Sequence, residues 1–310
     1  MKQKHLYIRT PLLEKVASPL PGKRVFFKME AYQPSGSFKL RGMEHACRAA
    51  LDKGAKGFLS SSGGNAGLAV AYVGRAWKVP VTVALPVSSP DSVARQLKNL
   101  GARVLMEGAA WDDTDVFCRE LCRKDPSLAY LPPFEHPMIW EGHSTIVDEL
   151  AAECEEEPDA IVLSVGGGGL LNGVALGLKR HGWEKTKVIA VETVGVDSLY
   201  QAYQAGKLVT LPEISSIAKS LGAKCVSPTA LSHAQEGLAI PCRVTDEQAV
   251  RACLFFADEQ RVLVEPACGA SLSLVYEQMD CLAPFRNIVV IVCGGAKVDV
   301  GMMKRWSEHI

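Results

Sequence analysis

Strand-like and helix-like segments alternate along almost the whole of this 310-residue chain. Short apolar runs rich in β-branched residues are each followed by a longer segment whose apolar residues recur at helical spacing. Continuous apolar strands of this kind are typical of parallel sheets that helices cover on both faces. The pattern therefore predicts an α/β fold, and the length fits two lobes or one large unit.

The alternation can be followed segment by segment. Predicted strands occupy residues 25–29, 57–60, 81–85, 103–106, 160–165, 188–191, 242–244 and 288–292. Predicted helices occupy residues 39–51, 66–77, 91–100, 112–123, 141–154, 170–180, 198–205, 246–258 and 267–279. Residues 206–241 show no regular pattern and are expected to be irregular.

Composition excludes several classes of function. Lys and Arg together number 34, as do Asp and Glu, so no charge excess favours nucleic acid or an anionic membrane surface. No apolar run is long enough to span a membrane, and residues 1–9 lack the apolar core of a signal peptide. The ten cysteines include no Cys-x-x-Cys pair, which favours reduced thiols in a cytoplasmic protein.

One lysine follows a turn-forming segment, Pro34-Ser-Gly-Ser-Phe-Lys39, and begins a predicted helix. Serines in such a segment are expected to cap backbone N–H groups. The positive end of the helix dipole disfavours an ammonium group beside it, and a lysine that must act as a neutral amine benefits from this position. Lys39 is therefore a candidate for covalent catalysis; the alternative is an ordinary surface lysine.

A second candidate segment, Ser60-Ser-Ser-Gly-Gly-Asn-Ala-Gly67, joins a predicted strand to a predicted helix. Its glycines allow backbone N–H groups to face a ligand, and its serines and Asn65 add side-chain donors. A turn of this kind at a helix N-terminus suits a carboxylate. The alternative is a flexible Ser/Gly connection.

Four consecutive glycines, Gly166–Gly169, form another strand-to-helix turn. Close backbone approach and several N–H donors are typical of phosphate binding. The turn lacks the Lys-Ser/Thr ending of a P-loop, and Leu171 stands where a dinucleotide fingerprint needs its third glycine. Because Glu192 ends the next predicted strand, a nicotinamide-dependent dehydrogenase remains an alternative at this point.

Two further side chains lie at predicted strand ends, where ligands gather in open α/β sheets. Cys293 follows the last predicted strand and precedes Gly294-Gly295, and Glu192 ends the strand at 188–191. Each also has a structural interpretation, because a buried cysteine is usually inert and a buried acid can be held by core partners.

Taken together, these segments resemble the fold-type II pyridoxal-phosphate enzymes, and most closely their short L-serine/L-threonine dehydratases. The resemblance covers nearly the whole chain. It rests on Pro34-Ser-Gly-Ser-Phe-Lys-Leu-Arg-Gly42, Ser61-Ser-Gly-Gly-Asn-Ala-Gly67, Pro132-Pro-Phe134 with Ile139-Trp-Glu-Gly-His143, Ser164-Val-Gly-Gly-Gly-Gly-Leu170, Val264-Glu-Pro-Ala-Cys-Gly-Ala270 and Ile291-Val-Cys-Gly-Gly295.

The resemblance implies a role for each candidate. Lys39 would form a Schiff base with pyridoxal 5'-phosphate and remove the Cα proton of the substrate, with Phe38 beside it. The phosphate would lie against Gly166, Gly167, Gly168, Gly169 and Leu170, the ring hydroxyl against Asn65 and the ring nitrogen against Cys293. The substrate carboxylate would be bound by Ser62, Gly63, Gly64, Asn65 and Ala66. A monovalent cation, K⁺, would be bound by Glu192 and the carbonyls of Gly166, Val196, Leu221 and Ala223.

The resemblance also implies an architecture and an activity. A large cofactor-binding domain would comprise residues 1–32 and 137–310, and a small domain, 33–136, would carry Lys39 and the substrate turn, with mostly parallel twisted sheets as in the tryptophan synthase β chain. The expected reaction is β-elimination from L-serine or L-threonine, giving pyruvate or 2-oxobutyrate and ammonia. The expected assembly is a homodimer acting on a small-molecule substrate.

Two positions bear on the choice of reaction. A neutral Cys293 would leave the ring nitrogen largely unprotonated, which favours loss of the β-group over transamination. Serine racemases of this fold have a serine where Gly63 stands, so racemisation is disfavoured, and Gly63 leaves substrate preference and rate open. A β-replacement enzyme of the cysteine synthase type and a non-catalytic cofactor-binding relative remain alternatives.

Overall fold

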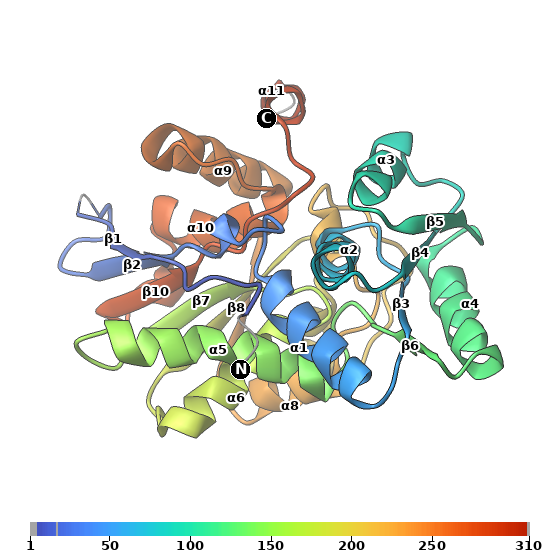
Figure 1. The fold of residues 1–310 in the computed structure, drawn as a ribbon. Helices are drawn as coiled ribbons and strands as arrows, with labels where there is room; N and C mark the ends of the chain where they lie inside the picture. The colour runs from blue at the N-terminus through green and yellow to red at the C-terminus, as the bar shows by residue number, and fades with distance from the viewer. Residues whose placement is uncertain (1–4, 17, 309–310) are drawn as a thin grey trace. The chain divides into compact units, whose positions relative to one another are not determined.

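The computed structural model describes residues 5–16 and 18–308, which form two compact units (Figure 1). The smaller unit holds the described residues up to Ile8 together with Gln33–Gly142. The larger unit holds Arg9–Tyr32 and the described residues from His143 onward. The sequence prediction placed residues 1–32 and 137–310 in the large domain, so residues 5–8 and 137–142 are grouped differently here. Residues 1–4 lie outside the described part of the chain.

Hydrogen bonds explain why residues 5–8 belong with the smaller unit. The backbone N–H groups of Leu6 and Tyr7 donate to the buried Glu44 carboxylate at 2.7 and 3.0 Å. The Gln33 side chain holds both the N–H and the carbonyl of Ile8, at 3.0 and 2.9 Å. Hydrogen bonds to an ionised carboxylate are stronger than those between neutral groups, so residues 5–8 are held against the helix that carries Glu44.

The smaller unit is built on a four-stranded parallel sheet with strand order β5-β4-β3-β6. Helices α2 and α4 lie on opposite sides of this sheet (Figure 1). All four residues of β3 are buried, as expected for a strand covered on both faces. The elements of this unit are α1 (Lys39–Asp52), β3 (Gly57–Ser60), α2 (Asn65–Trp77), β4 (Val81–Leu85), α3 (Asp91–Asn99), β5 (Arg103–Met106), α4 (Trp111–Lys124) and β6 (Leu128–Tyr130).

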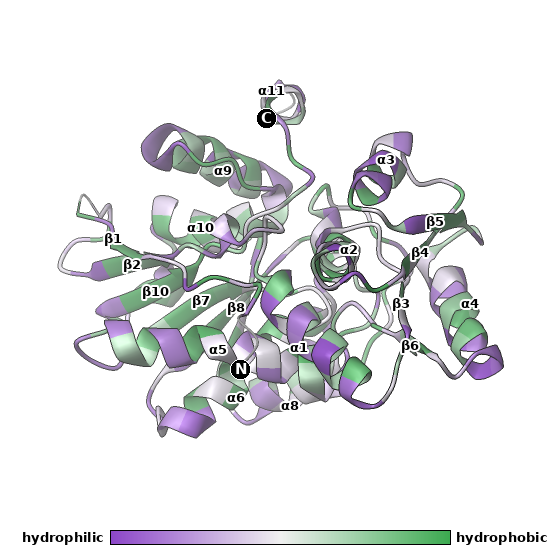
Figure 2. Cartoon of the chain, viewed as in Figure 1, coloured by the Kyte–Doolittle hydropathy of each residue, from purple (hydrophilic) through white to green (hydrophobic). Residues whose placement is uncertain are grey.

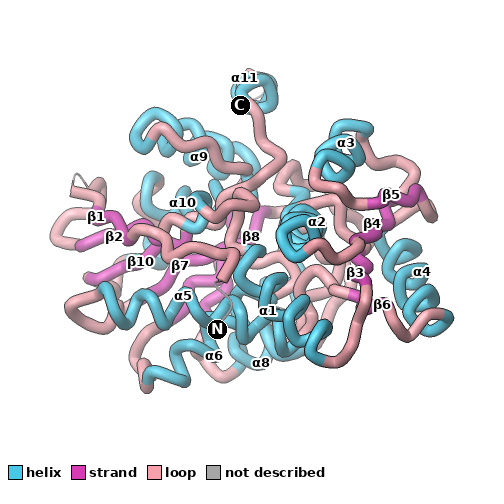
Figure 3. The backbone as a smooth tube through the Cα atoms, viewed as in Figure 1, coloured by secondary structure: helices cyan, strands magenta, loops and turns pink. Residues whose placement is uncertain are grey.

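The larger unit contains a six-stranded sheet with order β1-β2-β10-β7-β8-β9, and only the β1–β2 pairing is antiparallel among the described strands. Helices α9 and α10 cover one face, and α5 and α6 cover the other (Figures 1 and 3). Its central strands are almost entirely apolar (Figure 2). The elements are β1 (Leu12–Glu14), β2 (Arg24–Lys28), α5 (Pro137–Glu153, which begins in the smaller unit), β7 (Ala160–Ser164), α6 (Gly169–His181), β8 (Lys187–Thr193), α7 (Ser198–Ala205), α8 (Pro228–Gln235), β9 (Ala239–Val244), α9 (Asp246–Gln260), α10 (Pro266–Tyr276), β10 (Asn287–Ile291) and α11 (Val300–Ser307).

The predicted α/β fold with mostly parallel sheets is confirmed, and every predicted strand and helix is present. The prediction missed the three-residue strands β1 and β6, which are too short to show a period, and the short helices α8 and α11. It was wrong for part of residues 206–241, because Pro228 occupies the first turn of α8, where its missing N–H costs nothing. For the same reason α5 begins at Pro137 rather than near residue 141.

Candidate active site

Lys39 is the first residue of α1, and its amine is positioned by neighbours in the smaller unit. Its Nζ donates to the carbonyl oxygen of Pro133 at 2.7 Å and lies 5.1 Å from the centre of the Phe38 ring. The Pro132-Pro133 segment therefore contributes an acceptor for the amine, and Phe38 lies beside it. Lys39 is half-buried, so the amine is restrained without being sealed from a ligand.

The serines before Lys39 do not cap α1, which corrects the sequence prediction. Phe38, the residue before the helix, already has helical dihedral angles, and the N–H groups of Leu40 and Arg41 bond to backbone carbonyls at 3.3 and 3.1 Å. The hydroxyls of Ser35 and Ser37 are buried and bond to none of the described residues. Buried hydroxyls without partners are costly, so a ligand with polar atoms would be favoured here.

The turn between β3 and α2 contains the predicted substrate-binding residues. Ser62, Gly63 and Gly64 are half-buried, whereas Asn65 and Ala66 are buried at the start of α2. The turn is tight: the Gly64 N–H bonds to the Ser62 hydroxyl at 3.2 Å, and a Cβ on Gly67 would overlap the Ser62 carbonyl. A tight turn that leads into a helix N-terminus is suited to binding a carboxylate.

The four-glycine turn joins β7 to α6 in the larger unit. Its amides, from Gly166 to Leu170, donate to none of the described residues. Gly168 has φ of +93°, and a Cβ there would lie 2.6 Å from that of Ala230. The buried oxygens of Ser164 Oγ and Asn172 Oδ1 also lack partners among the described residues. A helix N-terminus with several available amides fits a phosphate group.

Strand order brings three of the predicted groups to one edge of the large sheet. Strands β10, β7 and β8 are adjacent and parallel, and at their carboxyl ends lie Cys293, Gly166–Gly169 and Glu192 respectively. Because carboxyl ends of adjacent parallel strands meet at the same edge, these groups share the edge at which α/β enzymes bind ligands.

Cys293 is buried, 8% exposed, and its Sγ lies 3.6 Å from the Ile291 carbonyl oxygen. Burial and a hydrogen bond with Cys293 raise the pKa of the Cys268 thiol well above its usual value. The following Gly295 has φ of +148°, and a Cβ there would overlap the Glu265 side chain. The site thus places a thiol, rather than a carboxylate, two residues after the end of β10.

Glu192 is fully buried, and burial raises the pKa of its carboxyl group to about 8. Its two oxygens accept hydrogen bonds from the N–H groups of Leu199 and Tyr200 at 2.9 and 2.7 Å, so it caps α7. The Ser198 hydroxyl is fully buried and lacks a partner among the described residues. Ser198 was not among the predicted site residues, because its burial is not visible in the sequence.

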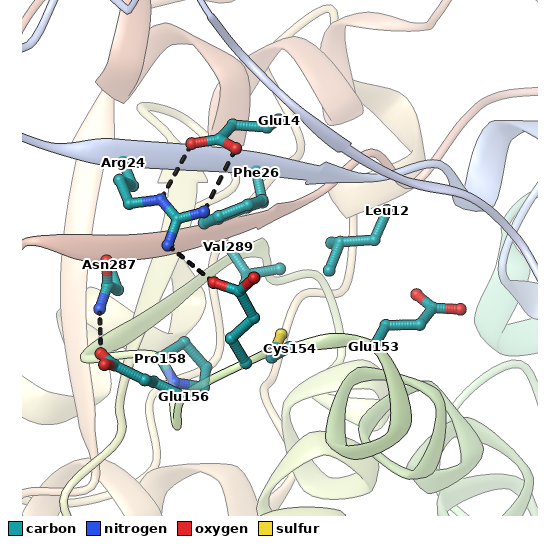
Figure 4. A pocket seen from close by; sticks show the side chains of 11 residues that line it. Leu12, Glu14, Arg24, Phe26, Glu153, Cys154, Glu156, Pro158, Asn287 and Val289 are labelled. Atoms are coloured by element: carbon teal, nitrogen blue, oxygen red, sulfur yellow. Dashed lines mark hydrogen bonds and ion pairs between the residues drawn. The ribbon is translucent and has the colours of Figure 1, made fainter.

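Further clusters among the described residues do not add to this site. A pocket of about 400 Å³ at the amino ends of β2 and β10 contains none of the predicted residues (Figure 4). Several of its polar groups pair with one another: Arg24 contacts Glu14 and Glu155, and Asn287 donates to Glu156. No trio of His, Cys, Asp or Glu in the described residues is placed to bind a metal ion. None of the described helices combines the length and apolarity needed to cross a bilayer.

An α/β protein with a lysine at the start of one helix and a row of available backbone amides at a glycine turn has groups that suit a phosphorylated ligand. The model of the family described as "Pyridoxal-phosphate dependent enzyme" matches residues 4–294. The chain therefore belongs to this family, and pyridoxal 5'-phosphate is its cofactor, as the resemblance implied.

Named relatives are similar over their full length. The human "L-serine dehydratase/L-threonine deaminase" is 42% identical, with 100% of this chain and 97% of that protein aligned. The human "Serine dehydratase-like" protein is 44% identical, with 100% and 96% aligned. Among solved structures, the L-serine ammonia-lyase from the fungus Rhizomucor miehei aligns with a TM-score of 0.89, 34% identity and coverage of 98% and 99%. Maize serine racemase aligns with a TM-score of 0.85, 27% identity and coverage of 98% and 94%.

Proposed function

We propose that this enzyme removes ammonia from L-serine and L-threonine by β-elimination, giving pyruvate and 2-oxobutyrate. The observation that carries the proposal is the full-length identity, above 40%, to relatives named for this activity. A dehydrogenase is disfavoured, because the family model spans both Lys39 and the glycine turn.

The proposed residue roles follow from the site. We propose that Lys39 binds the aldehyde of pyridoxal 5'-phosphate and that the glycine turn binds its phosphate. Asn65 would contact the ring hydroxyl, and Cys293 the ring nitrogen. The Ser164 hydroxyl, which has no partner among the described residues, adds a further donor at the phosphate turn. The available amides of Gly166–Leu170 support the assignment of the phosphate to the glycine turn.

Each residue contributes a distinct part of the reaction. The bound cofactor withdraws electrons from the substrate Cα and so acidifies its proton. The Lys39 amine accepts that proton, and the start of α2 with the Ser62–Ala66 turn holds the substrate carboxylate. The β-hydroxyl leaves as water, and the unsaturated product takes up water to give the 2-oxo acid and ammonia.

Purified enzyme incubated with L-serine or L-threonine, without added thiol, tests the activity. We expect ammonia and the matching 2-oxo acid in equal amounts. A cysteine synthase would instead need O-acetylserine with sulfide and would yield cysteine. A racemase would give D-serine without ammonia, and Gly63 disfavours that outcome because it provides no hydroxyl on the second face of the substrate. Absence of a 2-oxo acid from both substrates would contradict the proposed function.

Replacing Cys293 by alanine should preserve the bound cofactor and its absorbance but reduce turnover. The reason is that removing the thiol leaves the ring nitrogen without its partner, whereas the phosphate turn and Lys39 are unchanged. The measurements are the cofactor-to-protein ratio and kcat for serine. The half-buried Cys154 provides the control, because Cys154→Ala should change neither. An unaltered kcat in the Cys293 variant would count against its role.

We also propose that K⁺ binds between the Glu192 carboxylate, the Ser198 hydroxyl and the carbonyls of Gly166, Val196, Leu221 and Ala223. The Glu192 carboxylate is buried, and the Ser198 hydroxyl is buried with no partner in the described part of the chain. Both suit a cation, because burying a charge alone is costly. Gly166 supports the grouping, since a Cβ there would lie 3.2 Å from the Leu221 carbonyl oxygen.

Potassium chloride should raise both the unfolding temperature and the serine turnover relative to choline chloride at equal ionic strength. Glu192→Gln should abolish the difference between the two salts, and Ser198→Ala should shift it to higher K⁺ concentration. The measurement is a K⁺ titration of activity and of thermal unfolding. If the wild-type enzyme has the same turnover and the same unfolding temperature in the two salts, the proposed K⁺ site is contradicted.

The enzyme is further proposed to be a cytoplasmic homodimer. All ten cysteines are free thiols, which suits a reducing compartment. Light scattering of the purified chain would show the mass of two copies, and a monomeric mass would contradict the assembly.

A further inference from the structure

A chain of polar side chains leads from the surface of α4 to the beginning of the substrate-binding turn. The hydroxyls of Ser61 and Tyr130 are 2.6 Å apart, and the Tyr130 hydroxyl also bonds to the Asp115 carboxylate. The Arg119 guanidinium contacts the same carboxylate at 2.7 and 3.3 Å. All four residues belong to the smaller unit: Asp115 and Arg119 lie on α4, Tyr130 ends β6, and Ser61 begins the turn (Figure 1).

Chemistry fixes the direction of these bonds. An ionised carboxylate only accepts, so Tyr130 must donate its proton to Asp115. The Tyr130 oxygen is then available to accept, and the Ser61 hydroxyl donates to it. Arg119 completes the chain, because it pairs with Asp115 and lies 5.0 Å from the centre of the Tyr130 ring. Burial and the bond to Asp115 raise the pKa of Tyr130, so its hydroxyl remains protonated and able to donate.

Burial distinguishes this series of hydrogen-bonded side chains from a surface ion pair. Ser61 is 1% exposed, and the Tyr130 ring packs against the buried cluster of Leu59, Ala84 and Cys118. The Asp115 side chain is 16% exposed, whereas Arg119 is 58% exposed. The chain therefore runs from solvent into the core and ends on the turn.

Ser61 is the first residue of the connection between β3 and α2, and contacts from other elements hold it. Its carbonyl accepts a bond from the Thr114 hydroxyl at 3.4 Å, in addition to the Tyr130 contact of its side chain. The next residues make only local bonds among the described residues: the Ser62 N–H donates to the Ser60 hydroxyl, and the Gly64 N–H donates to the Ser62 hydroxyl. The Gly64 carbonyl accepts from the Leu68 N–H of α2 at 3.1 Å. The path of residues 62–64 is thus determined by Ser61 on one side and by α2 on the other.

We infer that Tyr130 is a positioning residue for substrate binding: held by Asp115 and Arg119, it fixes Ser61 and thereby the turn that binds the substrate carboxylate. The inference rests on the proposed function for the role of the turn. It assigns Tyr130 no contact with the substrate. Loss of the Tyr130 hydroxyl releases Ser61 and weakens carboxylate binding, and it leaves the phosphate turn intact, because that turn lies in the larger unit.

Tyr130→Phe should therefore raise KM for serine about three- to tenfold, the order expected for one lost hydrogen bond, with kcat changed much less. The cofactor content should equal that of the wild type. Ser61→Ala should have a similar effect, and the double variant should be no worse than either single variant, because both remove the same bond.

Tyr276→Phe is the matched control. Its hydroxyl also donates to a carboxylate, that of Glu259, and burial also raises the pKa of Tyr276, but it lies in the larger unit. This variant should leave KM unchanged. An unchanged KM in Tyr130→Phe, or additive effects in the double variant, would overturn the inference.

Hydrogen exchange separates this inference from the proposed function. Tyr130→Phe should accelerate exchange in peptides covering residues 61–66 relative to wild type and Tyr276→Phe, whatever substrate the enzyme uses. If the wild-type enzyme forms no 2-oxo acid, the proposed function fails, and the exchange result still tests the positioning role. Unchanged exchange in this segment would overturn it.

Discussion

Replacing Lys39 by alanine should abolish the yellow colour of the cofactor linkage and reduce serine turnover by about a thousandfold or more. Lys39 is proposed both to bind the cofactor covalently and to accept the Cα proton, and loss of a general base alone typically costs a factor of about 10²–10⁴. The Lys39 amine also contacts the Pro133 carbonyl at 2.7 Å, and losing that single bond should cost little stability.

The control for this variant is Lys53→Ala. Lys53 follows the last residue of the same helix and is exposed, so its replacement changes the charge equally without touching the site. Both variants should unfold at nearly the wild-type temperature. Wild-type turnover in Lys39→Ala would exclude this lysine as the base, and equal losses in both variants would indicate a charge effect instead.

Replacing Gly67 by alanine should disrupt the substrate-binding turn, whereas the same change at Gly63 should be tolerated. A Cβ on Gly67 would overlap the Ser62 carbonyl oxygen and lie 2.9 Å from its carbon, and backbone atoms can move only if the turn opens. A Cβ on Gly63 would lie 2.8 and 2.9 Å from the terminal methyl groups of Leu85 and Val93, which can rotate away. Overpacking against backbone costs about 1–3 kcal/mol or more.

The pair of alanine variants is compared by kcat/KM for serine and by thermal unfolding. We expect kcat/KM to fall by about a hundredfold or more in Gly67→Ala, in line with the cost of misplacing a bound substrate by about 1 Å. Gly63→Ala should retain the fold and substantial activity. A larger loss of kcat/KM in Gly63→Ala than in Gly67→Ala would show that the turn differs from the one described.

Much of the fold and of the candidate site could be predicted from the sequence, because both depend on local patterns. The fully buried strand at 57–60 was predicted with its observed bounds, since an apolar run bounded by turn residues has few alternatives. Lys39, the β3–α2 turn and the four glycines could be recognised for a similar reason: the chemistry of each resides in consecutive residues.

Features that depend on contacts between distant residues could not be predicted. Nothing near Tyr130 in the sequence indicates Ser61, 69 residues away, because their contact depends on the pairing of β3 with β6. The serine caps predicted before Lys39 are absent, because the backbone at Phe38 is already helical and supplies carbonyl acceptors instead. Ser198 became a candidate only when its hydroxyl was found buried without a partner among the described residues.

Mass spectrometry can show whether the Lys39 side chain is covalently joined to the cofactor. Freshly purified enzyme is reduced with borohydride, digested and analysed by mass spectrometry for the reduced cofactor. We predict that the added mass resides on the peptide containing Lys39, and that unreduced enzyme lacks it. A cofactor mass on a different lysine, or none on any peptide of a yellow preparation, would contradict the account.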